Sequence, residues 1–301
     1  MHSSTTAYAP RMGSESGAAR VTAGSVLLIV ALASLVGCSW SNPDAAQAPA
    51  RATTEPGSTS NQNGSPTDPT TPRRPSPTRY QPHPSEIDGA AKRAATRAIE
   101  SLPEVRRVTY TQYFGYQPPD ASILVEADFV NGGGTTYDVQ ISQTRQGWRT
   151  VSVIAATPIP PRQDPRPLVR QVLNNDRIAL PWAGRVDVAA GLVSDAVLRS
   201  MLAVAEHHPI GISVLISAHP VQVFGTDRRS SHPDGLAYDI GSIDGRLVVD
   251  PDAAELVREV MRIAAGTGSY QVGGPNDLDV GGTQYFSDPT HSDHVHVGFN
   301  R

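Results

Sequence analysis

Three histidines near the C-terminal end of the sequence are spaced so that they could hold a metal ion. The stretch DPTHSDHVHVGFNR contains His291, His294 and His296. From His294 to Phe299 the residues alternate, so in a strand the two imidazoles share one face while the valines pack on the other. His291 precedes them on the incoming loop. An HxH pair alone is a weak signal, so a metal site needs further ligands from elsewhere in the chain.

The stretch SSHPDGLAYDIG supplies an imidazole and a carboxylate, His232 and Asp239. In a strand, Asp239 projects to the same side as Ala237, and the small residues Gly235 and Ala237 leave room for an ion. Zinc takes nitrogen and carboxylate oxygen ligands, and a catalytic zinc site keeps three protein ligands and an exchangeable water. Two histidines and one aspartate complete such a set.

These two stretches resemble the motifs of a known superfamily. SSHPDGLAYD is similar to the SxHxxGxAxD signature of the zinc D-alanyl-D-alanine carboxypeptidases and their relatives, which include murein endopeptidases, lysostaphin-type enzymes and the hedgehog signalling domain. The residues on its fixed positions are Ser230, His232, Gly235, Ala237 and Asp239. The C-terminal HxH of the superfamily is matched by His294 and His296, and a preceding histidine of some murein endopeptidases by His291. The resemblance extends over roughly 194–301.

The resemblance implies a role for each of these side chains. His232, Asp239 and His296 would bind Zn²⁺, and His294 would lie beside the metal-bound water as a catalytic residue. Zinc lowers the pKa of its water and polarises a carbonyl, and a nearby imidazole can accept the water proton. His291 would either assist catalysis or orient its neighbours. Asp293 is expected on the opposite strand face from His294 and is not expected to be a ligand.

The sequence departs from the carboxypeptidase pattern before the first motif. A Gly-Tyr-Arg element, whose arginine helps to bind substrate, is replaced here by Ala218, His219 and Pro220. Arg228 and Arg229 are candidate substrate-binding substitutes, although an exposed arginine pair is also typical of a solvated turn. The sequence therefore leaves open carboxypeptidase or endopeptidase activity on peptidoglycan stem peptides or cross-links. It also leaves open a non-enzymatic zinc-binding or wall-binding role.

The elements that must position these residues form an α+β domain expected over 164–301. SDAVLRSMLAVAEHH, from Ser194, predicts a helix with a serine cap, and ISVLIS, 212–217, predicts a short buried strand. PDAAELVREVMRIAAG, 251–266, predicts a helix with Pro in its first turn and Asp250 as its cap. The proline-rich segment 156–167 is expected to link this domain to the preceding one.

A smaller α+β domain is expected over 86–160. Apolar residues at helical spacing predict one amphipathic helix over 86–102, and four segments of alternating pattern predict strands. These segments are VRRVTYTQY, ASILVEADFV, TTYDVQIS and WRTVSVIAA. Because the strands contain no His, Cys or paired carboxylates, we expect a helix on an antiparallel sheet with a structural or binding role.

The N-terminal residues have the layout of a bacterial lipoprotein signal peptide over 1–37. Arg11 and Arg20 precede the uncharged apolar run 21–37, and LVGC at its end resembles a lipobox whose Cys38 is lipidated. A single transmembrane anchor with an incidental cysteine is the alternative. In either case the rest of the chain is expected on the extracytoplasmic face of the cell membrane. The true start of translation is Met1 or Met12.

Composition bounds the remaining possibilities. Residues 38–85 are rich in Pro, Ser and Thr and poor in aliphatic residues, which predicts a disordered tether. The net charge of −4 and the lack of basic runs argue against nucleic acid as a partner. We expect peptidoglycan peptides as substrate and the membrane, through the lipid anchor at Cys38, as partner. Lys92 is the only lysine of the chain, and no function follows from that by itself.

Overall fold

A computed structural model of the chain describes residues 79–157 and 159–301. All of them belong to one compact unit, Pro69–Arg301. The expected signal peptide 1–37, Cys38, both candidate start residues and most of the expected tether lie outside the described residues. Helices together with antiparallel and mixed sheets make the described part an α+β fold, as the sequence predicts.

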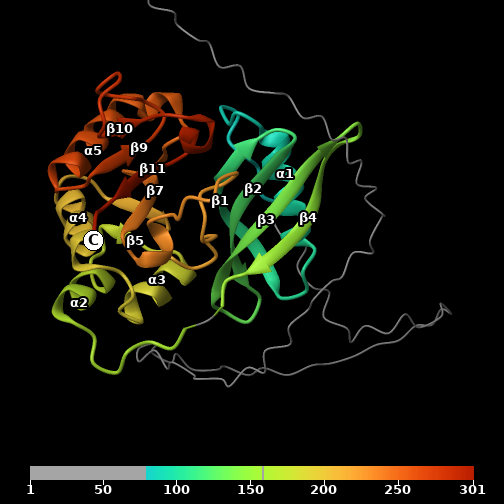
Figure 1. The fold of residues 1–301 in the computed structure, drawn as a ribbon. Helices are drawn as coiled ribbons and strands as arrows, with labels where there is room; N and C mark the ends of the chain where they lie inside the picture. The colour runs from blue at the N-terminus through green and yellow to red at the C-terminus, as the bar shows by residue number, and fades with distance from the viewer. Residues whose placement is uncertain (1–78, 158) are drawn as a thin grey trace, which may run out of the picture. The chain divides into compact units, whose positions relative to one another are not determined.

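One helix packed on an antiparallel sheet forms the first part (Figure 1). Helix α1, Gly89–Glu100, begins at Asp88, whose side chain accepts a hydrogen bond from the Ala91 N–H. The four strands pair in chain order: β1 Val105–Gln117, β2 Asp120–Phe129, β3 Gly134–Thr144 and β4 Gly147–Ala155. Buried alanines and Ile99 of α1 join the apolar face of this sheet in one hydrophobic core. The helix and the four strands predicted from periodicity are therefore confirmed.

A mixed seven-stranded sheet with helices packed on it forms the second part. Its strand order is β10-β9-β11-β7-β6-β5, with β8 paired to β7. The strands are β5 Ile178–Ala179, β6 Ile210–Val214, β7 Ala237–Ile243, β8 Arg246–Leu247, β9 Gln271–Gly273, β10 Tyr285–Phe286 and β11 Val295–Gly298. The helices are α2 Pro167–Leu173, α3 Trp182–Ala189, α4 Asp195–His207 and α5 Ala254–Gly266, with 3-10 turns η1 His232–Asp234, η2 Pro251–Ala253 and η3 Pro289–Ser292. In Figure 1, α4 and α5 lie together beside the sheet, and both contribute to its hydrophobic core.

Two elements of this part differ from the prediction. The strand expected over 212–217 ends at Val214, because the Asp187 carboxylate accepts hydrogen bonds from the N–H groups of Ile216 and Ser217 at 2.9 and 2.8 Å and draws them away from the sheet. The helix expected over 251–266 begins with the 3-10 turn η2, which Asp250 caps by accepting from the Asp252 N–H. The serine cap of α4 is confirmed, since Ser194 accepts from the Val197 N–H.

Strand β1 joins the two parts through side chains. It is an edge strand of its own sheet, and its Gln112 donates to Asp239 on β7, while the Tyr110 hydroxyl donates to the carbonyl of Asp293. From α1, Lys92 pairs with the Asp293 carboxylate. Residues of the first part therefore reach the histidines and carboxylates of the second.

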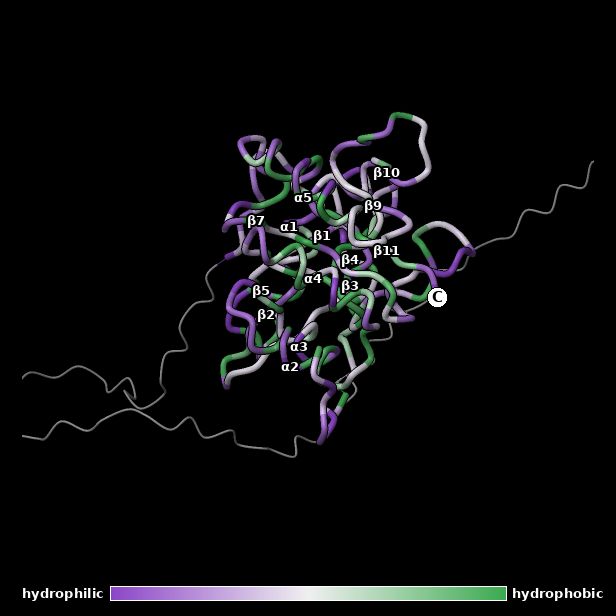
Figure 2. The backbone as a smooth tube through the Cα atoms, turned by 90° about the vertical axis from the view of Figure 1, so that its left-hand side faces the viewer, coloured by the Kyte–Doolittle hydropathy of each residue, from purple (hydrophilic) through white to green (hydrophobic). Residues whose placement is uncertain are grey.

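Apolar and polar residues are mixed along the described chain. Figure 2 shows hydrophobic and hydrophilic stretches that alternate at short intervals. Within 79–157 and 159–301, no helix has both the length and the apolar character needed to cross a membrane.

Candidate metal centre

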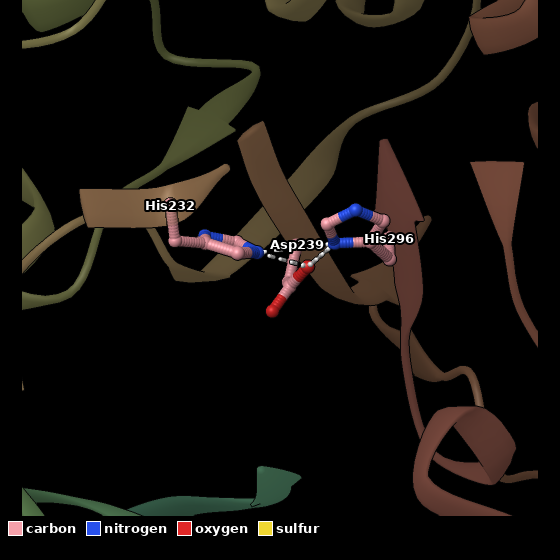
Figure 3. Close-up of side chains that lie close together, drawn as sticks. All are labelled: His232, Asp239 and His296. Carbon is pink, nitrogen blue, oxygen red and sulfur yellow. Dashed lines mark hydrogen bonds and ion pairs between the residues drawn. The ribbon is translucent and has the colours of Figure 1, made fainter. Parts of the chain in front are cut away.

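His232, Asp239 and His296 converge on one point (Figure 3). Nε2 of His232 and Nδ1 of His296 lie 3.1 and 3.0 Å from Oδ1 of Asp239, and the two nitrogens lie 3.0 Å from each other. All three side chains are buried. This group could hold a metal ion, and it contains the three residues that the sequence motifs indicate.

The sheet and one tight turn fix the positions of these ligands. Asp239 on β7 and His296 on β11 are direct partners in the antiparallel register, so their side chains project from the same face. His232 begins η1, which ends at Gly235 with a positive φ of 68°. A Cβ on Gly235 would lie 2.2 Å from the carbonyl oxygen of Leu192. The expectation that Gly235 leaves room for the ion is therefore wrong: this glycine is needed for its backbone conformation and its contact with Leu192.

Each of the three ligands is held by a second group. Nδ1 of His232 lies 2.6 Å from the Leu215 carbonyl and donates to it, which leaves the Nε2 lone pair facing the centre. Gln112 donates to Oδ2 of Asp239 at 2.6 Å. The side-chain amide of Gln271 lies 3.2 Å from Nε2 of His296. The Leu215 carbonyl fixes the ring and tautomer of His232, and Gln112 orients the Asp239 carboxylate, so these two donor atoms are preorganised for an ion.

The charges of the group favour a bound cation. Burial opposes ionisation of Asp239, but the neighbouring imidazoles of His232 and His294 outweigh it and hold its pKa well below the ordinary value. Burial lowers the pKa of His296 to about 4. An ionised carboxylate beside a neutral imidazole is the donor state that a divalent metal requires.

His294 lies beside the three ligands and is not one of them. Its Nε2 is 3.9 Å from Oδ2 of Asp239, and its Nδ1 is 2.7 Å from Oδ1 of Asp293. The two residues precede β11, which begins at Val295, so strand alternation does not apply to them. The expectation that Asp293 faces away from His294 is therefore wrong, although Asp293 is not among the metal-binding group.

His291 lies on η3, farther from the centre. Its Nδ1 is 2.9 Å from Oδ1 of Asp288, and its ring centroid is 5.0 Å from that of His294 and 5.7 Å from that of His296. It packs edge-on against Phe286. These contacts place His291 beside the other two histidines without adding a ligand to the group.

The two arginines expected to bind substrate differ in their contacts. Both line the cavity that contains the metal-binding group. The Arg229 guanidinium donates to both carboxylate oxygens of Asp234, from Nε to Oδ2 at 3.1 Å and from Nη2 to Oδ1 at 2.7 Å, and Arg301 also pairs with Asp234. No side-chain partner of Arg228 lies among the described residues. Arg228 is thus the more available of the two to a ligand.

His219 occupies the place where the carboxypeptidase pattern differs. Its ring stacks on His232 at a centroid distance of 4.3 Å and an interplanar angle of 15°, and it makes a T-shaped contact with Phe114 of β1. Its Nδ1 donates to the Pro220 carbonyl at 2.7 Å, and the preceding Ala218 has a positive φ of 64°. Burial holds the pKa of His219 well below its ordinary value. His219 therefore packs against His232 as a neutral ring and holds it in place.

A cavity of about 620 Å³ opens above the metal-binding group. Residues 112–117 of β1 form one wall, the loop 219–231 another, and β9, β10 and η3 the rest. Its volume is that of a site for a small molecule or a short peptide segment. A ligand in this cavity would contact both parts of the fold.

Gln112, Lys92 and His219 were not singled out from the sequence as site residues. Gln112 and Lys92 lie in segments without metal-binding motifs, where the only hint was that Lys92 is the sole lysine. His219 was seen only as a departure from a pattern. None of the three lies at a spacing that predicts its contacts with the centre.

The chain was compared with protein-family models, with curated proteins and with solved structures, and none of the three comparisons gave a match.

Proposed function

We propose that this chain is a zinc metallopeptidase of the cell envelope, anchored by lipid at Cys38. It hydrolyses peptide bonds in peptidoglycan stem peptides or cross-links, as a carboxypeptidase or an endopeptidase. The observation that carries the proposal is the buried His232, Asp239 and His296 group at the base of a cavity of about 620 Å³. The sequence motifs and the exported, tethered layout of the N-terminal residues add support.

The dimensions of the group suit zinc. Zinc bonds of about 2.0–2.1 Å in tetrahedral geometry separate two ligand atoms by about 3.3 Å. The three donor atoms lie 3.0–3.1 Å apart, so a small outward movement of the side chains fits them to the ion. Two nitrogens and one carboxylate oxygen are also a ligand set of catalytic zinc sites, which keep a further position open.

The side chains around the centre would have different roles in hydrolysis. Zinc, when bound, lowers the pKa of a water molecule and polarises the scissile carbonyl. His294 donates its Nδ1 proton to Asp293, so in the neutral ring the lone pair is on Nε2, which can accept a proton from the attacking water. The same imidazole can then protonate the leaving amine. Arg228 on the cavity wall can bind a carboxylate of the substrate.

The proposal is tested with the purified protein, by zinc analysis and by mass spectrometry of cross-linked muropeptides after digestion. We expect about one zinc per chain, and release of products that the His294→Ala variant makes roughly 10²- to 10⁴-fold more slowly while retaining the metal. His232→Ala should lose both metal and activity. Stoichiometric zinc with no cleavage of any muropeptide would sink the enzymatic proposal.

A non-enzymatic zinc-binding or wall-binding lipoprotein is the second candidate. It is favoured by the neutral, stacked His219 within the segment that replaces the Gly-Tyr-Arg element, and by the pairing of Arg229 with Asp234. His294→Ala separates the two candidates, since a binding module would keep its affinity for cell-wall peptides in this variant whereas an enzyme would lose turnover.

A further inference from the structure

The only lysine of the chain is fully buried in α1 and forms ion pairs with two carboxylates. Its Nζ lies 2.6 Å from Oδ2 of Asp293 and 2.5 Å from Oε1 of Glu86, and it also donates to the Thr111 carbonyl at 3.1 Å. The three protons of the ammonium group thus have three acceptors. A lysine is rarely buried unless it is paired. Lys92 therefore lies in α1 for its charged contacts and not for packing alone.

Of the two carboxylates, Asp293 is the more readily ionised. Burial opposes its ionisation, but the charge of Lys92 and the hydrogen bond from His294 outweigh burial and lower the pKa of Asp293. Burial instead raises the pKa of Glu86 to about 7. The backbone N–H of Tyr113 also donates to Oδ2 of Asp293, at 3.0 Å. Lys92 and β1 therefore fix the Asp293 carboxylate from the first part of the fold.

The other oxygen of that carboxylate determines how His294 is oriented. Oδ1 of Asp293 lies 2.7 Å from Nδ1 of His294. A carboxylate can only accept, so Nδ1 carries a proton, and in the neutral ring the lone pair is on Nε2. Nε2 faces the metal-binding group, 3.9 Å from Oδ2 of Asp239. Without a fixed carboxylate, the ring could turn or adopt the other tautomer.

We infer that the buried Lys92–Asp293 ion pair is a positioning device that holds His294 in the Nδ1-protonated tautomer with Nε2 facing the metal centre. The inference rests on the proposed function for the use that is made of Nε2. It gives the helix-and-sheet part a function in the site, because α1 supplies the cation and β1 a second donor to the same carboxylate.

The test uses the zinc-loaded full chain with ¹⁵N-labelled histidine, at one pH. The ¹⁵N shifts of an imidazole distinguish the two tautomers, and the His294→Ala variant assigns the resonances. Lys92→Met removes the ion pair, and Asp293→Asn removes it with little change of shape, in case Lys92→Met does not fold. The matched control is Thr96→Val, on the same helix and equally buried, since Thr96 donates only to the Arg93 carbonyl.

We expect Nδ1 protonation in the unaltered chain and in Thr96→Val, and a mixed or Nε2-protonated His294 in the other two variants. Because the ion pair acts on a group that reacts and not on binding, kcat should fall about 10- to 100-fold, with KM changed by less than about two-fold. The inference is overturned if His294 keeps the Nδ1-protonated tautomer in the Lys92→Met and Asp293→Asn variants while both are folded and bind zinc. If the unaltered chain cleaves no peptide, the proposed function fails, and the histidine shifts still decide whether the ion pair positions His294.

Discussion

The two parts of the described fold contribute to the candidate site in different ways. Residues 159–301 supply all three groups that could bind a metal, together with His294. Residues 79–157 supply none of these, but their Gln112 and Lys92 contact Asp239 and Asp293. The candidate ligands and the groups that orient them therefore come from different regions of the chain, although the sequence motifs lie in only one of these regions.

The strongest test of this comparison removes the first part. We expect a fragment of residues 159–301 to lose zinc affinity and cooperative unfolding. Asp239 and Asp293 would lose the Gln112 and Lys92 side chains that hold them, and the surface packed against β1 would face water. Circular dichroism melting and zinc analysis provide the measurement, with residues 79–301 as the control. A fragment that binds one zinc and melts like the control would show that the second part is independent.

Gln112→Ala tests the contact between β1 and Asp239, a candidate metal ligand. We expect zinc affinity to fall about 10- to 100-fold, because Asp239 loses the donor that orients it. Competition with a chelator of known affinity measures the change. Gln143→Ala, at an exposed position of β3, is the matched control, and equal affinities of the two variants would contradict a role for Gln112.

Arg228 and Arg229 allow a comparison within the cavity wall. We expect Arg228→Ala to raise KM for an anionic peptide roughly 10-fold, the loss of one charge-assisted hydrogen bond. Arg229→Ala should leave KM nearly unchanged, because that guanidinium is already paired with Asp234. Steady-state kinetics on one muropeptide measure KM for both variants. A larger rise of KM in Arg229→Ala than in Arg228→Ala would show that Arg229 leaves Asp234 to bind substrate.

Glu126 reports whether the two parts stay packed together. Burial and the nearby Asp128 raise its pKa to about 8, and it lies in a second cavity, of about 390 Å³, lined also by Trp182 of α3. A raised folded-state pKa gives stability that is present below the ordinary value of 4.5 and is lost as pH rises through about 8.

We therefore expect the ionisation of Glu126 to lower the free energy of unfolding by on the order of 2 kcal/mol between these two pH values. This is less than the full pKa shift implies, because the side chain is partly exposed. Glu126→Gln should remove that part of the pH dependence in urea titrations. Identical pH profiles of the two proteins would indicate that Glu126 is solvated and that the parts separate.

Local patterns in the sequence were sufficient for most of the elements. The helices α1, α4 and α5 and the four strands β1 to β4 follow from periodicity, and the cap of α4 follows from Ser194. The end of β6 did not follow, because it depends on Asp187, which lies far away in the chain. The position of Asp293 does not follow either, because Asp293 and His294 precede β11, where strand alternation does not hold.

The sequence by itself indicated the candidate metal-binding group, because His232 and Asp239 fall within one short motif and His296 within another. Only the tertiary structure decided what holds them. The partners of Asp239 and Asp293 are an amide on β1 and an ammonium group on α1, far from the motifs along the chain. Such contacts follow no local periodicity, since they are set by how two separately patterned sheets pack, and that packing brings the only lysine of the chain to a carboxylate beside the metal centre.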